Sequence, residues 1–389
     1  MKKSFGRIAI VHHSYTPRCL IEDELLEYLR PQTKEVVYLT HPFKTARESV
    51  PRYSEARFFR SGVLTKTITG PSGFGPEVLY FFKDFFYNLV FFIFIYRAKV
   101  DVFFGVNNFN AFSGIILRKL GKVDKVVYYV IDYVPNRFSN KVINSIYRTV
   151  EFFCVKHADV TWNVSPLMSQ ARIQDGLDKK YLAKQLTVPV GCHPISKERE
   201  KPKINKNTEF RLAFLGSLVP EQGVDLALDT LAVLATKYPL TKLIIIGSGN
   251  QETYLKVKAK ELKIKNNVEF KGYIVEDSKV LKILSSCHIG LAPYKLEKNS
   301  YKKYSDPSKI KSYFAAGLPV IITNISYMTK LIEEKNVGIV VKDNTKDLQA
   351  AIFQLIENSA DYTLKQSNVY QLAQELDWSK IFSKAFLSL

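Results

Sequence analysis

A segment at positions 304–321, YSDPSKIKSYFAAGLPVI, combines residue types and spacing suited to binding a phosphate group. Asp306 or Ser305 can cap a short helix there, and the glycine and proline that follow the helix end it before an apolar strand. Ser308 and Lys309 would lie in the first turn, where free backbone N–H groups and the helix dipole favour an anion. A capped helix with a solvated lysine has the same spacing, so spacing alone leaves both interpretations open.

Glycines mark two more turns of the kind that bring a backbone close to a phosphate. LGSLVPEQG places Gly216 at the end of an apolar run and Gly223 before an amphipathic segment. IIIGSGN places Gly247 and Gly249 at the end of the next apolar run. A single G-x-G is weak, because any tight strand-to-helix turn uses one. Two such turns at neighbouring strand ends favour a nucleotide-binding crevice.

The elements that would position these residues alternate between short β-rich runs and helix-length segments. This alternation predicts an α/β fold of two Rossmann-like doubly wound domains, each a parallel sheet covered by helices on both faces. In the first half the expected strands are Arg7–His12, Glu35–Thr40, Asp101–Gly105, Val126–Ile131, Asp159–Val164 and Thr187–Val190. In the second half they are Arg211–Gly216, Lys242–Gly247, Val268–Gly272, His288–Pro293, Pro319–Thr323 and Gly338–Lys342. The charged stretch 197–209 between the two halves is the expected linker, with domains at 1–196 and 210–374.

The composition fits a globular protein with an excess of positive charge. The 389 residues are 46% hydrophobic and 24% charged, which excludes a wholly disordered chain and a polytopic membrane protein. A net charge of +19, larger in the first half, and 13% aromatic residues suit a surface that meets anionic groups beside apolar ones. The four cysteines form no CxxC pair, so neither a zinc site nor a disulfide framework is expected. Because the start predicts a strand rather than a signal peptide, we expect a cytoplasmic protein.

The run Phe85–Tyr96, FFYNLVFFIFIY, contains no charged residue. As a helix it would measure about 18 Å, short of the roughly 30 Å hydrocarbon core of a membrane. A buried helix is therefore the favoured interpretation, and a transmembrane span is the least favoured. A helix pressed into a membrane interface lies between them, supported by the aromatic residues and by the basic stretch Arg47–Arg60.

In order and spacing, the motifs of the second half resemble the donor-binding domain of GT-B glycosyltransferases of the family-four-like group, the glycosyl transferases group 1. The similar strings are GSL, VPEQG, IIIGSG, VEFKGYI, LAPY and DPSKIKSYFAAGLPVI, in that order over residues 210–360. The resemblance implies nucleotide contacts from strand ends and from one helix, namely Gly216, Tyr273, Ile274, Ser308, Lys309 and Ser312. The tail, 375–389, resembles the helix that crosses back to the first domain in this fold.

The chain departs from the family pattern at several ligand positions. Ser217 and Gln222 stand where such enzymes usually have an Arg and a Lys that hold the diphosphate. Tyr304 and Ser312 stand where the family carries two glutamates. Lys309 remains, and its surroundings are also similar to those in an inverting glucuronosyltransferase group of the same fold. Tyr301, Tyr304 and Asp306 are then the nearest polar side chains that could meet the donor sugar.

In the first domain the resemblance points to the strand end in YYVIDYVPNRF, where such enzymes hold a residue that faces the acceptor. Asp132 there would take the proton from an acceptor hydroxyl as the hydroxyl attacks the sugar. The alternative is that Asp132 caps a turn and pairs with Arg137. His12 and His13, at the end of the first expected strand, are the other candidates for the base.

Together these features predict a metal-independent glycosyltransferase whose substrate is a nucleotide-diphosphate sugar, expected to be a UDP-sugar, and which needs no cofactor. Lys309 and the helix N-terminus would stabilise the departing diphosphate. The expected acceptor is a hydroxyl of a glycan or of a lipid-linked sugar, and the basic, aromatic first half favours an anionic membrane surface on the cytoplasmic side. Two alternatives stay open: a UDP-sugar epimerase of the same fold, and a basic nucleic-acid-binding module, which no recognisable motif supports.

Overall fold

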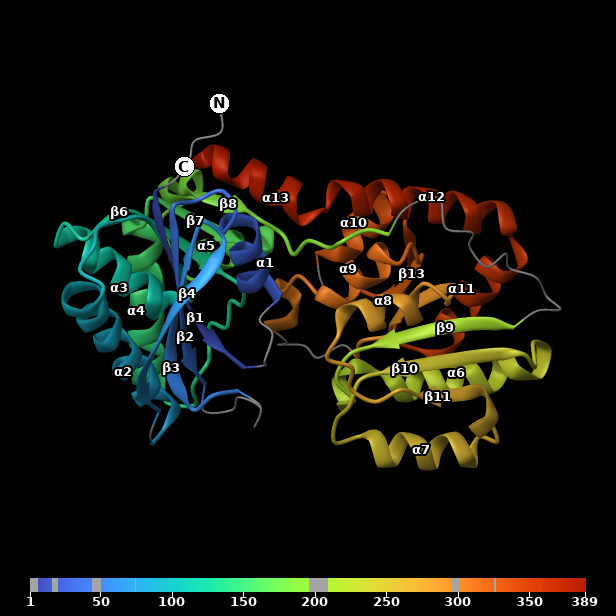
Figure 1. Ribbon diagram of the computed structural model, residues 1–389. Coiled ribbons are helices and arrows are strands. Elements are labelled where there is room, and N and C mark those ends of the chain that lie inside the picture. Colours follow the sequence, from blue (N-terminus) through green and yellow to red (C-terminus); the bar gives the residue numbers. More distant parts are fainter. Residues whose placement is uncertain are drawn as a thin grey trace. The chain divides into compact units, whose positions relative to one another are not determined.

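The computed structural model describes residues 6–15, 20–43, 50–73, 75–195, 209–295, 301–324 and 327–389. The chain divides into two compact units; in Figure 1 the first is coloured from blue to green together with the red C-terminal helix, and the second mostly from yellow to red. Unit 1 comprises Met1–Pro189 and Trp378–Leu389, and unit 2 comprises Val190–Asp377. The division thus falls before the expected linker at 197–209, which lies, except for Glu209, outside the described residues.

Unit 1 is built on an eight-stranded sheet with the strand order β4-β3-β2-β1-β5-β6-β7-β8. The strands are β1 (Arg7–Ser14), β2 (Glu35–Pro42), β3 (Tyr53–Arg60), β4 (Val63–Ser72), β5 (Val100–Val106), β6 (Val123–Val130), β7 (Val160–Asn163) and β8 (Gln185–Thr187). All pairs from β2 to β8 are parallel, and the chain reverses its winding direction between β1 and β5. This is the predicted doubly wound order with an additional antiparallel ribbon at one edge.

Helices cover both faces of this sheet. On one side, α1 (Leu20–Leu29) packs against α13 (Trp378–Ala385), where the Tyr28 and Ser383 hydroxyls lie 3.1 Å apart. On the other side lie α2 (Glu77–Val90), α3 (Asn108–Lys119) and α4 (Lys141–His157), as Figure 1 shows. The π-helical turn η1 (Phe91–Ile95) continues α2, and α5 (Pro166–Gln174) and two short 3₁₀ turns complete the unit. The last helix of the chain therefore belongs to unit 1.

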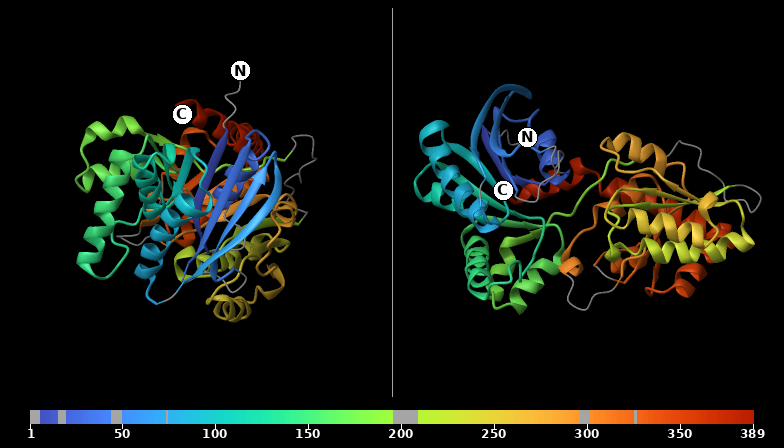
Figure 2. Two further views of the ribbon diagram at one scale, coloured as in Figure 1. Left: turned by 60° about the vertical axis from the view of Figure 1, so that its left-hand side comes forward. Right: turned by 90° about the horizontal axis from the view of Figure 1, so that it is seen from below.

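The ribbon β3–β4 at the edge of the sheet is an addition that the sequence analysis did not predict (Figure 2, left). A two-residue turn joins the strands, with φ of +48° at Ser61 and +82° at Gly62. Positive φ at both positions is the requirement of the type I′ turn, which matches the twist of a hairpin. Most residues of β4 are exposed, so the strand lacks the apolar alternation that identifies half-buried strands.

Unit 2 has a six-stranded, wholly parallel sheet with the strand order β11-β10-β9-β12-β13-β14. The strands are β9 (Phe210–Leu215), β10 (Thr241–Ile246), β11 (Val268–Phe270), β12 (Ile289–Ala292), β13 (Val320–Thr323) and β14 (Gly338–Val341). The helices are α6 (Val224–Lys237), α7 (Glu252–Glu261), α8 (Asp277–Leu284), α9 (Ser308–Ala315), α10 (Met328–Glu334), α11 (Thr345–Glu357) and α12 (Ser359–Glu375). Because helices cover both faces, the central strands are nearly continuous apolar runs, which is why all six were predicted.

Candidate functional site

The strand order of unit 2 places a topological switch point between β9 and β12, because the chain winds away from these two strands in opposite directions. Gly216 follows β9 and Gly247 follows β10, so both glycines lie at the carboxyl edge of the sheet. The Gly216 N–H donates to the Ile246 carbonyl at 2.9 Å, and the Gly247 N–H donates to the Gly272 carbonyl at 2.8 Å. These bonds tie the turns after β9, β10 and β11 into one backbone surface.

Glycine is required on this surface by geometry. Gly247 has φ of +141°, and a Cβ atom built on it would lie 1.9 Å from the Gly216 carbonyl oxygen. No side chain fits there, so glycine allows the turns after β9 and β10 to pack directly against each other.

Lys309 reaches this surface from the first turn of α9. A Cβ atom on Gly216 would lie 2.9 Å from the Lys309 ammonium nitrogen Nζ, which shows how closely the two residues approach. The Nζ donates a hydrogen bond to Gln222 Oε1 at 2.5 Å and lies 4.3 Å from the centre of the Phe214 ring. The side chain is buried, with only 7% of the residue exposed. A buried cation beside two glycine turns at a switch point is an arrangement suited to a diphosphate.

The N-terminus of α9 differs from the expectation that Asp306 or Ser305 caps it. The N-cap position is Pro307, and no side chain there accepts a bond from the first turn. Ser308 is exposed, and the half-buried Ser312 donates from Oγ to the Ser308 carbonyl at 3.3 Å. With no side-chain cap, the first-turn N–H groups keep the capacity to bind an anion.

Asp306 is buried among other groups of unit 2. Its Oδ2 accepts a hydrogen bond from the Val190 N–H at 2.8 Å, and its Oδ1 lies 3.2 Å from the Lys311 Nζ. Burial raises the pKa of Asp306, an effect that Lys311 opposes. These contacts argue against the expected position beside a sugar and give Asp306 a structural role at the start of unit 2.

The remaining expected donor contacts lie on loops of unit 2. Tyr273 follows the turn at Gly272 and is 45% exposed, and Ile274 beside it is half-buried. Tyr304 is half-buried, with the Lys303 Nζ 4.7 Å from the centre of its ring. The structure thus brings together Gly216, Gly247 and Lys309, whereas contacts of Tyr273, Ile274 and Tyr304 with a ligand stay predictions.

In unit 1, Asp132 follows β6 and its side chain is exposed. The surrounding protein atoms raise the pKa of the Asp132 carboxyl. The positive charge of Arg137 opposes this shift, and the exposure of the side chain to solvent limits it. Arg137 itself is engaged elsewhere, because its guanidinium donates to Glu77 Oε1 at 2.7 Å and to the Tyr15 hydroxyl at 3.1 Å. This arrangement disfavours the alternative in which Asp132 and Arg137 form a pair.

The two candidate histidines are buried on opposite faces of the sheet. The His13 Nε2 lies 3.0 Å from Asp84 Oδ2, inside a polar network under α2. The His12 Nε2 lies 3.1 Å from the Thr40 hydroxyl on the α1 side, and burial lowers the pKa of His12 well below its usual value. Neither histidine is exposed at the surface.

Glu22 was missed as a candidate, although the sequence contains a signal for it. It lies on the same stripe of α1 as the buried residues Leu25 and Leu29, where a carboxyl is unexpected. Burial raises the pKa of Glu22 to about 8, and its carboxyl is 3.7 Å from His12 Nδ1. Groups with shifted pKa values gather at functional sites. The face of the unit 1 sheet that α1 covers is therefore the candidate site for the acceptor.

Metal ligation has no support from the described part of the chain. In those ranges, no three or more His, Cys, Asp and Glu side chains are grouped so that they could hold a metal ion.

Comparison with known proteins identifies a matching family and two curated relatives that are similar to part of the chain. Residues 196–372 match the family described as glycosyl transferases group 1. An uncharacterized glycosyltransferase of Haemophilus influenzae is 30% identical over 176 residues, which are 45% of this chain and 47% of that protein. The chitobiosyldiphosphodolichol beta-mannosyltransferase of Yarrowia lipolytica is 24% identical over 133 residues, 33% of this chain and 28% of that enzyme. These matches therefore span less than half the length of either curated relative.

Solved structures show similarity over nearly the whole chain. HepE from Anabaena, crystallised in complex with UDP, has a TM-score of 0.67 at 15% identity, covering 98% of this chain and 100% of that one. The sucrose-phosphate synthase of Thermosynechococcus elongatus has a TM-score of 0.66 at 15% identity, with the same coverage. This likeness confirms the predicted fold of two Rossmann-like domains.

Proposed function

We propose that the protein transfers a sugar from a UDP-sugar to a hydroxyl of a glycan or lipid-linked acceptor, because residues 196–372 match the glycosyl transferases group 1 family. The observation that carries this proposal is the position of Lys309 beside Gly216, at the switch point of a sheet that has the Rossmann strand order. The solved complexes of HepE with UDP and with UDP-glucose support UDP as the nucleotide.

In this proposal the diphosphate lies over the turns at Gly216 and Gly247, against the first turn of α9. Negative charge develops on the diphosphate as its bond to the anomeric carbon breaks. The Lys309 ammonium and the first-turn N–H groups of α9 stabilise that charge from fixed positions. The residues themselves supply the electrostatic stabilisation, so the chemistry runs without a metal ion.

Asp132 is the proposed base on the acceptor side. Its carboxylate takes the proton from the acceptor hydroxyl while the hydroxyl oxygen forms the new bond to the anomeric carbon. A raised pKa brings this carboxylate nearer to the operating pH, which suits a general base. Asp132→Asn should therefore reduce turnover and leave the Kd for UDP unchanged.

A membrane surface is part of the proposal because of helix α2. The described residues contain one helix, Glu77–Ile95, that is long and apolar enough to cross a membrane by length and composition, yet only 28% of its most apolar window is buried. The favoured expectation of a buried helix was therefore wrong. Phe86 and Phe94 are 60% and 63% exposed, whereas the polar Asp84 and Asn88 are fully buried.

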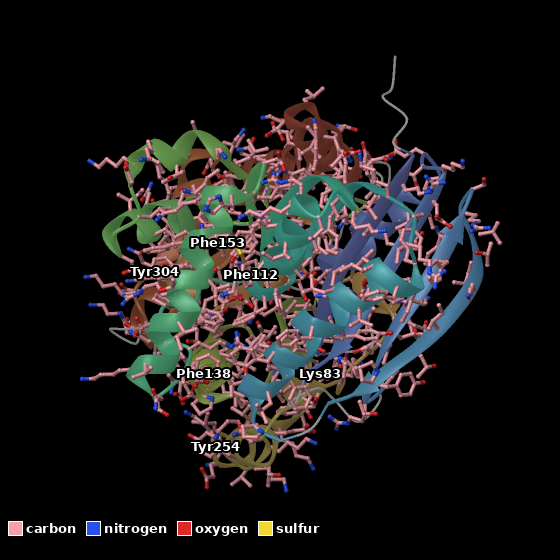
Figure 3. All side chains as sticks on the ribbon, turned by 90° about the vertical axis from the view of Figure 1, so that its left-hand side faces the viewer. Lys83, Phe112, Phe138, Phe153, Tyr254 and Tyr304 are labelled. Carbon is pink, nitrogen blue, oxygen red and sulfur yellow. The ribbon has the colours of Figure 1, made fainter. Side chains whose placement is uncertain are left out.

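This inverted pattern fits a helix that lies on a membrane and is anchored by its polar side. The Asn88 Oδ1 lies 2.9 Å from His41 Nε2, and Asp84 contacts His13, so α2 is joined to the sheet and does not cross a bilayer alone. Figure 3 shows this face of unit 1, with Lys83 labelled on α2. The net charge of +19 would attract the chain to anionic lipid headgroups, which supports a peripheral position on the cytoplasmic side.

The test is binding of nucleotides to the purified full-length chain, followed by turnover. UDP at 100 times its Kd should raise the unfolding free energy by about 2.7 kcal/mol, which a thermal shift detects. UDP should be released from a UDP-sugar faster when a lipid-linked sugar in vesicles is added. No stabilisation by UDP, GDP or ADP would contradict the proposal, and release of UDP at the same rate without any acceptor would favour an epimerase.

A further inference from the structure

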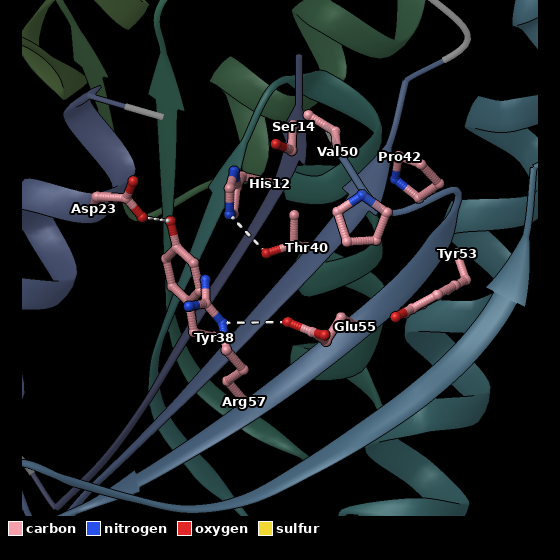
Figure 4. A pocket seen from close by; sticks show the side chains of 11 residues that line it. His12, Ser14, Asp23, Tyr38, Thr40, Pro42, Val50, Tyr53, Glu55 and Arg57 are labelled. Atoms are coloured by element: carbon pink, nitrogen blue, oxygen red, sulfur yellow. Dashed lines mark hydrogen bonds and ion pairs between the residues drawn. The ribbon is translucent and has the colours of Figure 1, made fainter. Parts of the chain in front are cut away.

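A small pocket of about 160 Å³ lies on the face of the unit 1 sheet opposite to α2 (Figure 4). Its polar lining comes from three neighbouring strands and from α1, and consists of His12, Asp23, Tyr38, Thr40, Glu55 and Arg57. The Ser14 side chain and two prolines complete its rim. None of these positions was predicted to act together, because the ribbon that supplies Glu55 and Arg57 was missed.

The register of the strands explains why these side chains meet. His12 pairs with Thr40, and Thr40 pairs with Glu55, so the three residues form one row across β1, β2 and β3. Tyr38 pairs with Arg57 in the next row on the same face. Since side chains two residues apart point to the same side of a strand, the two rows form a continuous polar floor.

The pocket is rich in hydrogen-bonding groups that the protein only partly satisfies. The Tyr38 hydroxyl donates to Asp23 Oδ1 at 2.6 Å, and the Arg57 guanidinium lies 4.8 Å from the centre of the Tyr38 ring. The Arg57 Nε is 3.5 Å from Glu55 Oε1, too poorly aligned for a hydrogen bond. Both this Nε and the His12 Nδ1 are buried without a hydrogen-bond partner among the described residues. Such atoms are costly unless a ligand or water meets them.

Charge and size restrict the ligand. Two carboxylates, those of Asp23 and Glu55, and one guanidinium line the pocket, and burial keeps His12 neutral by lowering its pKa, so the pocket is not suited to a phosphate. Its volume is below the roughly 300–1,000 Å³ of sites for drug-sized ligands, which excludes a nucleotide. Closely spaced donors and acceptors beside the apolar rims of Pro42 and Val50 match a single ring that carries several hydroxyl groups and C–H faces.

We propose that this pocket binds one neutral hexose residue of the acceptor glycan, with Asp23 and Glu55 accepting from its hydroxyls and Arg57 donating to them. The inference rests on the proposed transferase function, since it assigns the pocket to the acceptor. In this inference Arg57 takes part in recognising the acceptor and does not contact the nucleotide.

The experiment uses saturation-transfer NMR on the full chain with the methyl glycosides of glucose, galactose, mannose and N-acetylglucosamine. At least one glycoside should receive saturation, and Arg57→Ala should weaken its binding about tenfold or more, because a charged hydrogen-bonding partner is lost. Arg57→Lys retains the charge and should bind with intermediate strength. Lys66→Ala is the control, because Lys66 pairs with Phe58 and therefore lies on the opposite face of the ribbon.

Parallel titration with UDP separates this inference from the proposed function. Glycoside binding that depends on Arg57, with UDP binding unchanged in all variants, supports it. UDP binding without binding of any glycoside, or glycoside binding that Arg57→Ala leaves intact, overturns the pocket assignment and leaves the transferase standing. Glycoside binding without UDP binding overturns the proposed function and the acceptor role with it.

Discussion

Replacing Lys309 by Met tests the donor site most directly, because it removes the ammonium group and keeps a flexible side chain against Phe214 and Tyr294. The Nζ lies next to Gly216, so a phosphate on that turn would receive a charged hydrogen bond from it. Such bonds contribute about 1.5–3 kcal/mol. At about 1.4 kcal/mol for each factor of ten, the Kd for UDP should rise about 10- to 100-fold in Lys309→Met.

The same substitution has a cost in stability that must be measured separately. It leaves the Gln222 Oε1 without the bond from Nζ, which costs about 1–3 kcal/mol if no water replaces it. Isothermal titration calorimetry with UDP should therefore be run well below the Tm of the variant. Lys295→Met is the matched control, because Lys295 forms a partly exposed ion pair with Asp225 at 2.7 Å, which is worth about 1 kcal/mol.

A wild-type Kd for UDP in Lys309→Met, with a folded variant and an unchanged control, would refute the reasoning. The phosphate groups would then lie away from both Gly216 and the first turn of α9. Weaker binding in both variants would instead show that net charge, rather than the position of Lys309, attracts the nucleotide.

Three further predictions concern unit 1. Phe86→Ser should lower the fraction of protein that sediments with anionic liposomes at low salt, whereas Leu387→Ser, at a residue 86% exposed near the C-terminus, should not change it. Arg172→Met should reduce the free energy of unfolding by about 3–5 kcal/mol in urea titrations, because the buried Glu151 carboxylate, 2.7 Å from the guanidinium, loses its partner. A loss under 1 kcal/mol would contradict this expectation. The pKa of His41 is lowered from 6.5 to about 4, chiefly by burial, so its contribution of up to about 3 kcal/mol is present above pH 6.5 and is lost as the pH falls towards 4. Urea titrations at pH 7 and pH 5 should show this loss in the wild type and less of it in His41→Gln.

The sequence predicts unit 2 well because its signals are local. Each of its six strands is a short, mostly apolar run closed by a turn, and both faces of the sheet are covered, so burial does not depend on distant segments. The cap of α9 was mispredicted because Asp306 has a stronger partner, Lys311, and a distant backbone donor at Val190. Local capping rules do not include such competitors.

Unit 1 was predicted less well because its polar contacts join segments far apart in the chain. The run Phe85–Tyr96 contains no charged residue, but the orientation of α2 follows from Asp84 and Asn88, whose partners His13 and His41 lie on β1 and β2. The two sets of residues that form this hydrogen-bond network are too far apart in the sequence for a local pattern to reveal it. The signal for the ribbon was present in the Ser-Gly pair between two β-rich segments, although the charges of β3 were interpreted as a basic stretch.

The register of β1 positions two adjacent histidines on opposite faces of the unit 1 sheet. His12 and His13 are neighbours in β1 and therefore point to opposite faces of the sheet, one to the candidate sugar pocket and the other to the network that holds α2. A slip of one residue would exchange the two faces, so the buried contact between His13 and Asp84 fixes the strand position that the pocket needs. Any change that loosens α2 from the sheet should therefore also disturb the rows that contain Thr40 and Arg57. In this protein the attachment of the exposed apolar helix and the shape of the pocket are set by the same pairing of β1 with β2.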